Sequence, residues 1–110
     1  MDTLAMLKLL GEPTRLAILN ALLERKHCVR SLARKLGITE SAVSQHLKRM
    51  REAGLVYCEP YGYHSHYYPS TEALEQIEAL LHRMAEQSRA LNREEKDCQC
   101  QWKENENAAD

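Results

Sequence analysis

Apolar residues recur at helical spacing through the first part of the chain. Leucines three residues apart predict a short helix over residues 3–10, which we expect Gly11 to end as a left-handed cap. Pro13 suits the first turn of a second helix, which extends to about Arg25, because the missing N–H of proline is not needed there. The chain therefore opens with two helices joined by a short link.

A second pair of helical patterns is joined by an even tighter link. Apolar residues at i, i+3, i+4 and i+7 from Val29 predict a third helix, which Gly37 closes. Thr39 is a good N-cap for a fourth helix, although Ala42 stands where a capping box would place Glu or Gln. Two helices with a three-residue link match a helix-turn-helix, whose second helix enters a DNA groove.

The fourth helix, over residues 39–54, has two contrasting faces. Val43, Leu47 and Met50 recur on one face, as a core requires. The opposite face carries small hydroxyls, an amide and cations, which contact base edges and phosphates in a major groove. We predict that Ser41, Ser44 and Gln45 read bases and that Lys48 and Arg49 contact phosphates.

The pattern changes from helical to extended after Gly54. Residues 55–58 and 63–68 read as two strands, with a turn at residues 60–62 and a stop at Pro69. A β-hairpin that directly follows a recognition helix is typical of a wing, which reaches an adjacent groove or phosphates.

A long helix is predicted from the capping residue Ser70. Its apolar positions follow steps of three and four, with one polar member, and they are Leu74, Ile77, Leu81, Met84, Ser88 and Leu91. Such a heptad seam favours a dimer, although a helix packed on its own domain would show a similar stripe. Beyond Arg93 the chain is charged and without periodicity, so we predict one domain over residues 1–92 and a flexible acidic tail with Cys-x-Cys over residues 93–110.

Length and composition limit the size, the location and the class of protein that we expect. A length of 110 residues allows one domain with a modest core, which a shared dimer core would help to stabilise. We expect a cytoplasmic protein that does not enter a membrane, because no apolar run approaches the ~20 residues of a membrane span and the N-terminus lacks a signal pattern. No nucleophile, base and orienting group occur together at a recognisable spacing, so an enzyme is not expected.

The net charge of −1 conceals an uneven distribution. Residues 1–69 carry ten Lys and Arg against six Asp and Glu, a balance of +4, whereas residues 70–110 carry five against ten, a balance of −5. A basic front and an acidic back fit a protein that approaches a polyanion from one side, although a solvated acidic helix and tail would give the same count.

The order of elements, with the sequences Leu10–Leu19 (LGEPTRLAIL) and Ser41–Leu47 (SAVSQHL), resembles the ArsR/SmtB family. The resemblance covers roughly residues 4–90. It implies a mainly α-helical winged helix-turn-helix with five helices, and a homodimeric repressor that binds palindromic double-stranded operator DNA until an inducer, often a metal or metalloid ion, releases it. The first and last helices form the dimer interface in that family, which implies a role for Leu4, Leu7, Leu74, Ile77, Leu81 and Met84.

The base-reading positions of the family fall here on Glu40, Ser41, Ser44 and Gln45. A carboxylate would repel phosphate, so we expect Glu40 to stabilise the helix dipole instead. The wing also departs from the family, because its usual Arg or Lys tip is replaced by residues 60–64 (PYGYH). DNA contact there would be weaker, or would depend on protonation of His64 and His66.

Several effectors fit the four cysteines. Only one of the arsenic-sensor thiols of the family is kept, at Cys28, and a three-thiolate site for As(III), Cd(II) or Pb(II) would need Cys98 and Cys100 as well. Cys58 with His64 and His66 has ligand types that suit Zn(II). A thiol redox switch is a further alternative, as are cysteines without any sensing role. The rival hypothesis of another class is a metal- or thiol-binding protein that does not regulate transcription.

Overall fold

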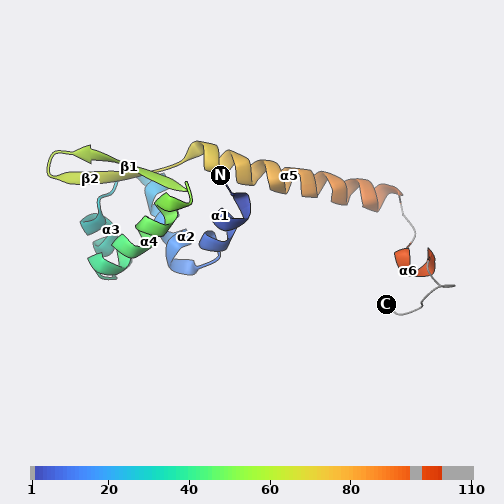
Figure 1. Cartoon of the computed structure of the whole chain (residues 1–110), viewed down its shortest axis with the longest axis horizontal. Coiled ribbons are helices and arrows are strands. Elements are labelled where there is room, and N and C mark those ends of the chain that lie inside the picture. Colours follow the sequence, from blue (N-terminus) through green and yellow to red (C-terminus); the bar gives the residue numbers. More distant parts are fainter. Residues whose placement is uncertain (1, 95–97, 103–110) are drawn as a thin grey trace. The chain divides into compact units, whose positions relative to one another are not determined.

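The protein is described from a computed structural model, in which residues 2–94 and 98–102 are placed. The chain forms two compact units, Met1–Glu78 and Ala79–Asp110, and each is considered by itself. The first unit holds the first four predicted helices, the hairpin and the start of the long helix, and these elements are shown in Figure 1. In the placed residues, no helix is both long and apolar enough to cross a membrane.

Helices α1 (Thr3–Leu10) and α2 (Pro13–Glu24) form as the sequence predicts, but the cap between them differs. Gly11 has φ −73° and ψ −6°, so the expectation of a left-handed cap is wrong. Its N–H donates to the carbonyl oxygens of Leu7 and Lys8, at 3.0 and 3.2 Å. Right-handed geometry suffices because the chain continues directly into Pro13 at the start of α2.

The helix-turn-helix consists of α3 (Val29–Leu36) and α4 (Glu40–Glu52). Gly37 ends α3 with φ 71°, a left-handed conformation in which a side chain would be strained. Thr39 Oγ1 then accepts the N–H of Ala42 at 3.0 Å and caps α4. Local signals at these two residues therefore set the angle between the helices.

The wing is an antiparallel hairpin of β1 (Val56–Tyr61) and β2 (His64–Pro69). The predicted turn at residues 60–62 is displaced, because Pro60 pairs with Ser65 inside the ladder and the turn lies at residues 62–63. Gly62 has φ 61°, which a two-residue hairpin turn favours. A two-stranded hairpin leaves one edge of each strand unpaired, so it tolerates the missing N–H of Pro60.

The core of the first unit lies between the helices and the base of the wing. Its fully buried side chains come from every element from α1 to β1, and the largest are Met6, Ile18, Leu32, Val43, Leu47, Met50, Leu55 and Val56. Helix α5 (Thr71–Glu94) adds Ala73 and Ile77 to this core. The predicted winged helix-turn-helix with five helices is therefore confirmed.

The second unit contains the rest of α5 and a one-turn helix, α6 (Gln99–Trp102). Helix α5 extends two residues past the predicted boundary at residue 92, and α6 lies within the predicted tail. Residues 95–97 and 103–110 of that tail lie outside the described residues, so its flexibility stays a prediction.

Candidate nucleic-acid interface

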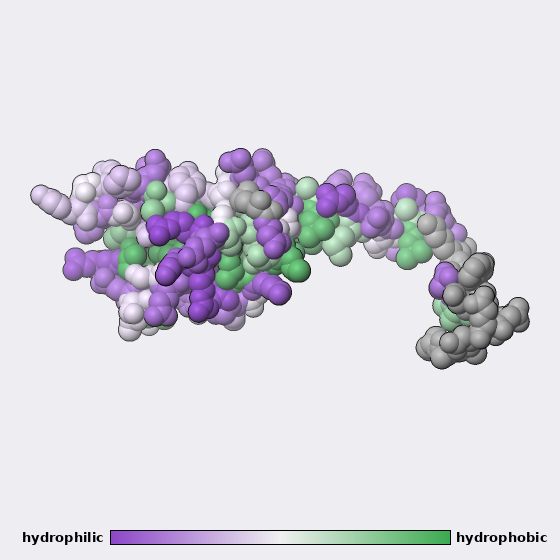
Figure 2. All heavy atoms as spheres, in the orientation of Figure 1, coloured by the Kyte–Doolittle hydropathy of each residue, from purple (hydrophilic) through white to green (hydrophobic). Residues whose placement is uncertain are grey.

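Helix α4 presents the predicted polar residues to solvent. Val43, Leu47 and Met50 are at most 1% exposed. Those on the other side of the helix are all exposed, and they are Ser41, Ser44, Gln45, Lys48 and Arg49. Hydrophilic side chains gather over α4 in Figure 2. The apolar face thus fixes the helix on the core, and the outward face is free to contact another molecule.

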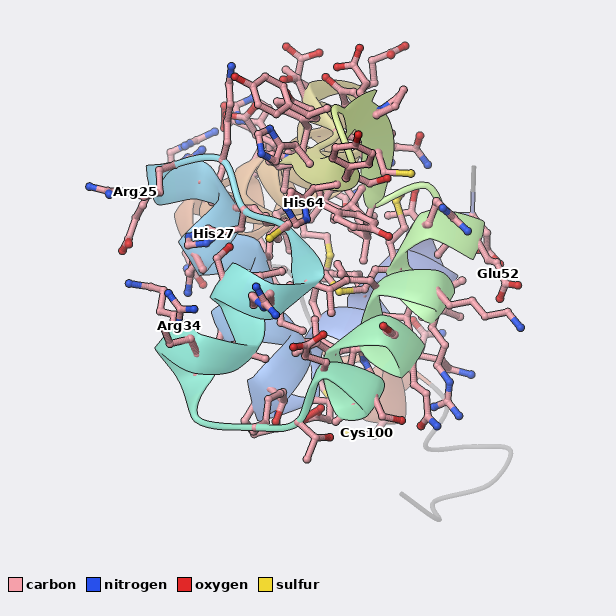
Figure 3. All side chains as sticks on the ribbon, turned by 90° about the vertical axis from the view of Figure 1, so that its left-hand side faces the viewer. Arg25, His27, Arg34, Glu52, His64 and Cys100 are labelled. Atoms are coloured by element: carbon pink, nitrogen blue, oxygen red, sulfur yellow. The ribbon has the colours of Figure 1, made fainter. Side chains whose placement is uncertain are left out.

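A shallow hollow of about 280 Å³ lies on this outward face. It is lined by Gln45, Lys48, Arg49 and Glu52. The sequence had not suggested Glu52, whose carboxylate extends away from α4 (Figure 3). A carboxylate among cations can accept a hydrogen bond from the amino group of cytosine, as acidic side chains do when proteins read DNA bases. The same carboxylate would repel a phosphate group. The hollow therefore combines an amide, two cations and one carboxylate.

The N-terminus of α4 contains an ion pair that involves Glu40. Its Oε2 lies 3.9 Å from Nε of Arg30, at the start of α3, and both side chains are well exposed. An exposed pair contributes little to stability. It nevertheless gives the Glu40 carboxylate a partner within the protein, while the expected effect of Glu40 on the helix dipole stays a prediction.

A polar cluster that the sequence did not suggest fixes the other side of α4. Arg15 Nη1 lies 3.4 Å from His46 Nδ1, and Arg15 Nε donates to the Leu9 carbonyl at 2.7 Å. Because arginine only donates, Nδ1 must accept, so His46 carries its proton on Nε2, which faces Glu12 Oε2 at 3.8 Å. The cluster joins α1, α2 and α4. Its members are too far apart in sequence for a local pattern to reveal.

Glu12 belongs to this cluster and also caps α2. Its Oε1 accepts the backbone N–H of Thr14. That hydrogen bond holds the pKa of Glu12 below its usual value, against the opposing effect of burial, and His46 and Arg15 act in the same direction. Glu12 is therefore ionised at neutral pH, as a partner of Arg15 and His46 must be.

The wing offers aromatic rings and no cation at its tip. Tyr63, in the turn, is fully exposed, and Tyr61 is 65% exposed. The Tyr61 ring stacks on His66 with centroids 4.4 Å apart. Between residues 56 and 69 the one charged residue besides histidine is Glu59. His64 is exposed directly after the turn, and its contact with DNA stays a prediction.

The ladder rules out the hairpin zinc site considered from the sequence. Cys58 pairs with Tyr67, whereas His66 pairs with Glu59 and His64 with Tyr61. Paired residues share a face and successive residues alternate, so Cys58 lies on the opposite face from both histidines. The Cys58 sulfur instead accepts a hydrogen bond from Arg51 Nη1 at 3.1 Å, which ties the wing to α4.

Cys28 occupies the N-cap position of α3. It lines an open pocket of about 400 Å³ between the starts of α3 and α4 and the wing, together with Arg30, Glu40, His64 and Tyr67 among others. Burial by itself would raise the pKa of the Cys28 thiol, but hydrogen bonds from the backbone and hydroxyl of Ser31 and from backbone N–H groups outweigh burial and lower that pKa. Cys28 is therefore a half-buried thiol with increased thiolate character.

The other two predicted thiol ligands lie in the second unit. Cys98 and Cys100 are exposed, and their sulfurs are 2.7 Å apart. Among the residues that the structure places, no group of three or more His, Cys, Asp or Glu side chains could hold a metal ion. The three-thiolate site of Cys28, Cys98 and Cys100 therefore stays a prediction.

The predicted dimer residues divide into two groups. Ile77 is buried in the core of the first unit, and Leu7 and Leu74 pack against that core. Three others keep more than half of their surface exposed: Leu4 at 62%, Leu81 at 53% and Met84 at 56%. The first residues of the seam in α5 thus pack within the first unit, whereas the side chains of Leu81 and Met84 remain more than half exposed.

Comparison with known proteins identifies the family. The sequence model described as "Bacterial regulatory protein, arsR family" matches residues 12–57, from the start of α2 to β1. The nodulation protein NolR of Rhizobium meliloti is 42% identical over 50 residues, which are 46% of this chain and 41% of NolR. The match thus spans about two fifths of the length of that relative.

Solved structures extend the likeness beyond the matched segment. One, of a possible transcriptional regulator for arsenical resistance, is 33% identical with a TM-score of 0.65, over 72% of this chain and 82% of its own. Another, of the homodimeric winged helix-turn-helix DNA-binding domain of Mb0332 from Mycobacterium bovis, is 26% identical with a TM-score of 0.61, over 74% and 76% of the two chains. The family consists of regulatory proteins, which agrees with the expectation that the chain is not an enzyme. The chain belongs to the arsR family of bacterial regulatory proteins.

Proposed function

We propose that the protein is a sequence-specific transcriptional regulator that binds double-stranded operator DNA as a homodimer and represses transcription. The observation that carries this proposal is the outward face of α4. Ser41, Ser44 and Gln45 are exposed there, beside Lys48 and Arg49, on a helix that Val43 and Leu47 anchor in the core. Short polar side chains on a rigid helix are suited to reading base edges.

The distribution of cations favours α4, rather than the wing, as the element that contacts phosphates. Lys48 and Arg49 stand beside the proposed base readers, whereas the hairpin has no Lys or Arg. Phosphate contacts supply most of the salt-dependent affinity for DNA. Helix α4 therefore supplies a larger share of that affinity than a wing with a cationic tip would leave to it.

A salt titration tests this role of α4. The Lys48→Ala and Arg49→Ala proteins should each bind a promoter fragment more weakly, and the slope of log affinity against log salt should become about one unit shallower for each phosphate that the variant no longer neutralises. The Lys8→Ala protein, which lacks an exposed cation of α1, is the matched control and should keep the wild-type slope. Unchanged slopes for both α4 variants would contradict phosphate binding by this helix.

The same measurement separates the proposal from its rival. A metal- or thiol-binding protein that uses the fold only as a scaffold would retain no promoter DNA selectively over unrelated DNA at any salt concentration. Selective retention by the wild-type protein would therefore exclude that function as the whole explanation.

We further propose that an effector acts at Cys28, as either a soft metalloid ion or a thiol oxidant. The supporting observation is the combination of a lowered Cys28 pKa with a pocket that borders both helices of the helix-turn-helix and the wing. The similarity to a possible regulator of arsenical resistance favours a soft ion. The lowered pKa of the Cys28 thiol, which increases its thiolate fraction, also supports an oxidant.

Substitution of Cys28 should separate effector action from DNA binding. The Cys28→Ser protein should bind operator DNA as the wild type does, but it should no longer be released by As(III), Cd(II) or a thiol oxidant, because serine has no thiolate. Labelled operator DNA titrated with each agent gives the measurement, and Zn(II) serves as a comparison. Cys58→Ser, which removes a second half-buried thiol, is the matched control and should respond normally.

Variants of the two cysteines in the second unit distinguish a metalloid ion from a thiol oxidant as the effector. Replacing Cys98 and Cys100 together by serine should abolish release by As(III) if three thiolates hold the ion. Release by oxidant alone, in the wild type and in this double variant, would assign the switch to Cys28 chemistry without the ion. Normal release of Cys28→Ser by every agent would remove Cys28 from the mechanism.

A further inference from the structure

The positive charge of the first part of the chain is concentrated in one short segment. Residues 1–69 carry ten Lys and Arg against six Asp and Glu, and residues 24–35 alone hold five of those cations and one of those acids, a balance of +4. The other positions up to residue 69 carry five of each, so they balance to zero. We call the five cations of this segment the basic shoulder, and all of them are exposed: Arg25, Lys26, Arg30, Arg34 and Lys35.

The basic shoulder begins next to α4 and continues away from it. Arg30 Nε lies 3.9 Å from the carboxylate of Glu40, the first residue of α4. Arg34 follows Arg30 by four residues in α3, so the two side chains lie on one face of that helix. In Figure 3, Arg25 and Arg34 extend from the side of the molecule opposite to Glu52 of α4. The shoulder is therefore a surface separate from the outward face of α4.

Contacts between α2, α3 and the wing hold the shoulder in place. Lys35 Nζ of α3 is 3.3 Å from the carboxylate of Glu24 at the end of α2, which brings the two ends of the segment together. Between them His27 is buried, and its carbonyl oxygen accepts the backbone N–H of Tyr67 in β2 at 3.0 Å. The ammonium of Lys26 lies 5.9 Å from the centre of the Tyr68 ring, at cation–π distance. The cations are thus carried by backbone that is fixed before any partner binds.

Two cations of the shoulder have no acidic partner. Lys35 is paired with Glu24, and Arg30 with Glu40. No ion pair among the residues that the structure places includes Arg25 or Arg34. Like charges gathered on one surface create a positive potential that attracts a polyanion. Three of the five cations are arginines, whose guanidinium groups match the oxygens of a phosphate in geometry.

We propose that the basic shoulder is a second phosphate-binding surface, which holds the sugar–phosphate backbone of duplex DNA beside the groove that α4 reads. The inference rests on the proposed function, because it takes α4 as the helix in the groove. In a helix-turn-helix the first helix crosses the DNA backbone, so cations of α3 and of the link before it lie where phosphates pass. Phosphate contacts carry no sequence information, so the shoulder adds affinity for duplex DNA without adding base preference.

The salt dependence of DNA binding measures the contribution of the shoulder. The Arg25→Ala, Arg34→Ala protein loses two exposed cations without acidic partners, so its fold should be kept. Its slope of log affinity against log salt should be about two units shallower than that of the wild type, and a fourfold rise in salt should weaken the wild type roughly tenfold more than the variant. Its preference for operator over scrambled DNA should equal that of the wild type.

Two further variants identify charge at these positions as the cause. The Arg83→Ala, Arg93→Ala protein loses two exposed arginines of α5 outside the apolar seam, and as the matched control it should keep the wild-type slope. The Arg25→Lys, Arg34→Lys protein keeps both charges and should keep most of the slope.

Ethylation interference locates the phosphates that the shoulder holds. Ethylation removes the negative charge of one phosphate, so a modified phosphate that weakens binding marks a contact. Some positions should weaken binding of the wild type but not of the Arg25→Ala, Arg34→Ala protein. These positions should border the base pairs at which Ser44→Ala and Gln45→Ala change selectivity.

Three results would overturn the shoulder as a DNA contact. They are a wild-type slope for the double alanine variant, an equal loss of slope for the double lysine variant, and a loss of operator preference in the double alanine variant. An unchanged DNA slope together with lost binding to phosphatidylglycerol vesicles would assign the shoulder to a membrane surface instead. Unrelated duplex DNA serves for the same slope measurement, so the shoulder is decided even if the wild type shows no operator preference, a result that would contradict the proposed function alone.

Discussion

Changing Ser44 and Gln45 together to Ala should abolish the preference of the protein for its operator while leaving most of its affinity for unrelated DNA. Each side chain is exposed on α4, and each well-placed base contact contributes about 1–3 kcal/mol of discrimination. The double variant should therefore lose roughly 2–6 kcal/mol of preference for the operator. Lys48 and Arg49 remain in place, so phosphate binding and its salt dependence should persist.

Competition binding with operator and scrambled DNA measures this change in preference. Gln87→Ala is the matched control, because it removes the same kind of side chain as Gln45 from an exposed position of α5 outside the seam. The control protein should keep its selectivity. A Ser44 and Gln45 variant that still prefers the operator by the wild-type factor would show that base readout lies elsewhere, with Ser41 and the wing as the next positions to test.

Helix α4 could be predicted because its signals are local. Gly37 and Thr39 end one helix and begin the next through their own backbone and hydroxyl, and the apolar steps of Val43 and Leu47 set the buried face. None of these depends on residues distant in sequence. The polar face follows by exclusion, so the positions proposed to read bases could be named from the sequence.

Errors arose where a local residue type has two structural solutions. Proline and glycine both mark turns, so the sequence predicts the turn at residues 60–62, whereas Pro60 is accommodated on an open edge and the reversal lies at residues 62–63. Gly11 also marks a helix end, yet its right-handed conformation shows that the type of cap depends on where the chain goes next.

The features that the sequence did not predict depend on contacts between residues that are distant in sequence. His46 is 31 residues from Arg15, and no spacing rule joins them. The one indication in the sequence was the position of His46 beside the buried stripe of α4, where the ring would need a hydrogen-bond partner. His27 is similar, because its burial and its bridge to Tyr67 appear only when the wing folds back on the link before α3.

Helix α5 shows how one periodic stripe can serve two purposes. The predicted heptad seam is consistent both with packing in the chain and with a dimer, and in the structure only its first residues pack within the chain. Ile77 is 8% exposed in the core of the first unit, whereas Leu81 and Met84 remain more than half exposed. We expect a second copy of the chain to cover this apolar surface.

Changing Leu81 to Glu should therefore convert the protein to a monomer and weaken operator binding. A twofold interface presents each residue twice, and burying one leucine contributes about 1.5–3 kcal/mol, so the dimer dissociation constant should rise by roughly 100-fold or more. Native mass spectrometry across a dilution series gives the measurement, and Met84→Glu should act in the same way.

The matched control is Ala79→Glu, which adds the same charge to α5 about 200° around the helix from Leu81. Ala79 is exposed, so this protein should stay dimeric and bind its operator normally. A monomeric protein can occupy one half-site at a time, and the Leu81→Glu protein should lose affinity for the palindrome while its affinity for an isolated half-site is unchanged. A Leu81→Glu protein that remains dimeric at the same concentration would place the dimer interface away from this part of α5.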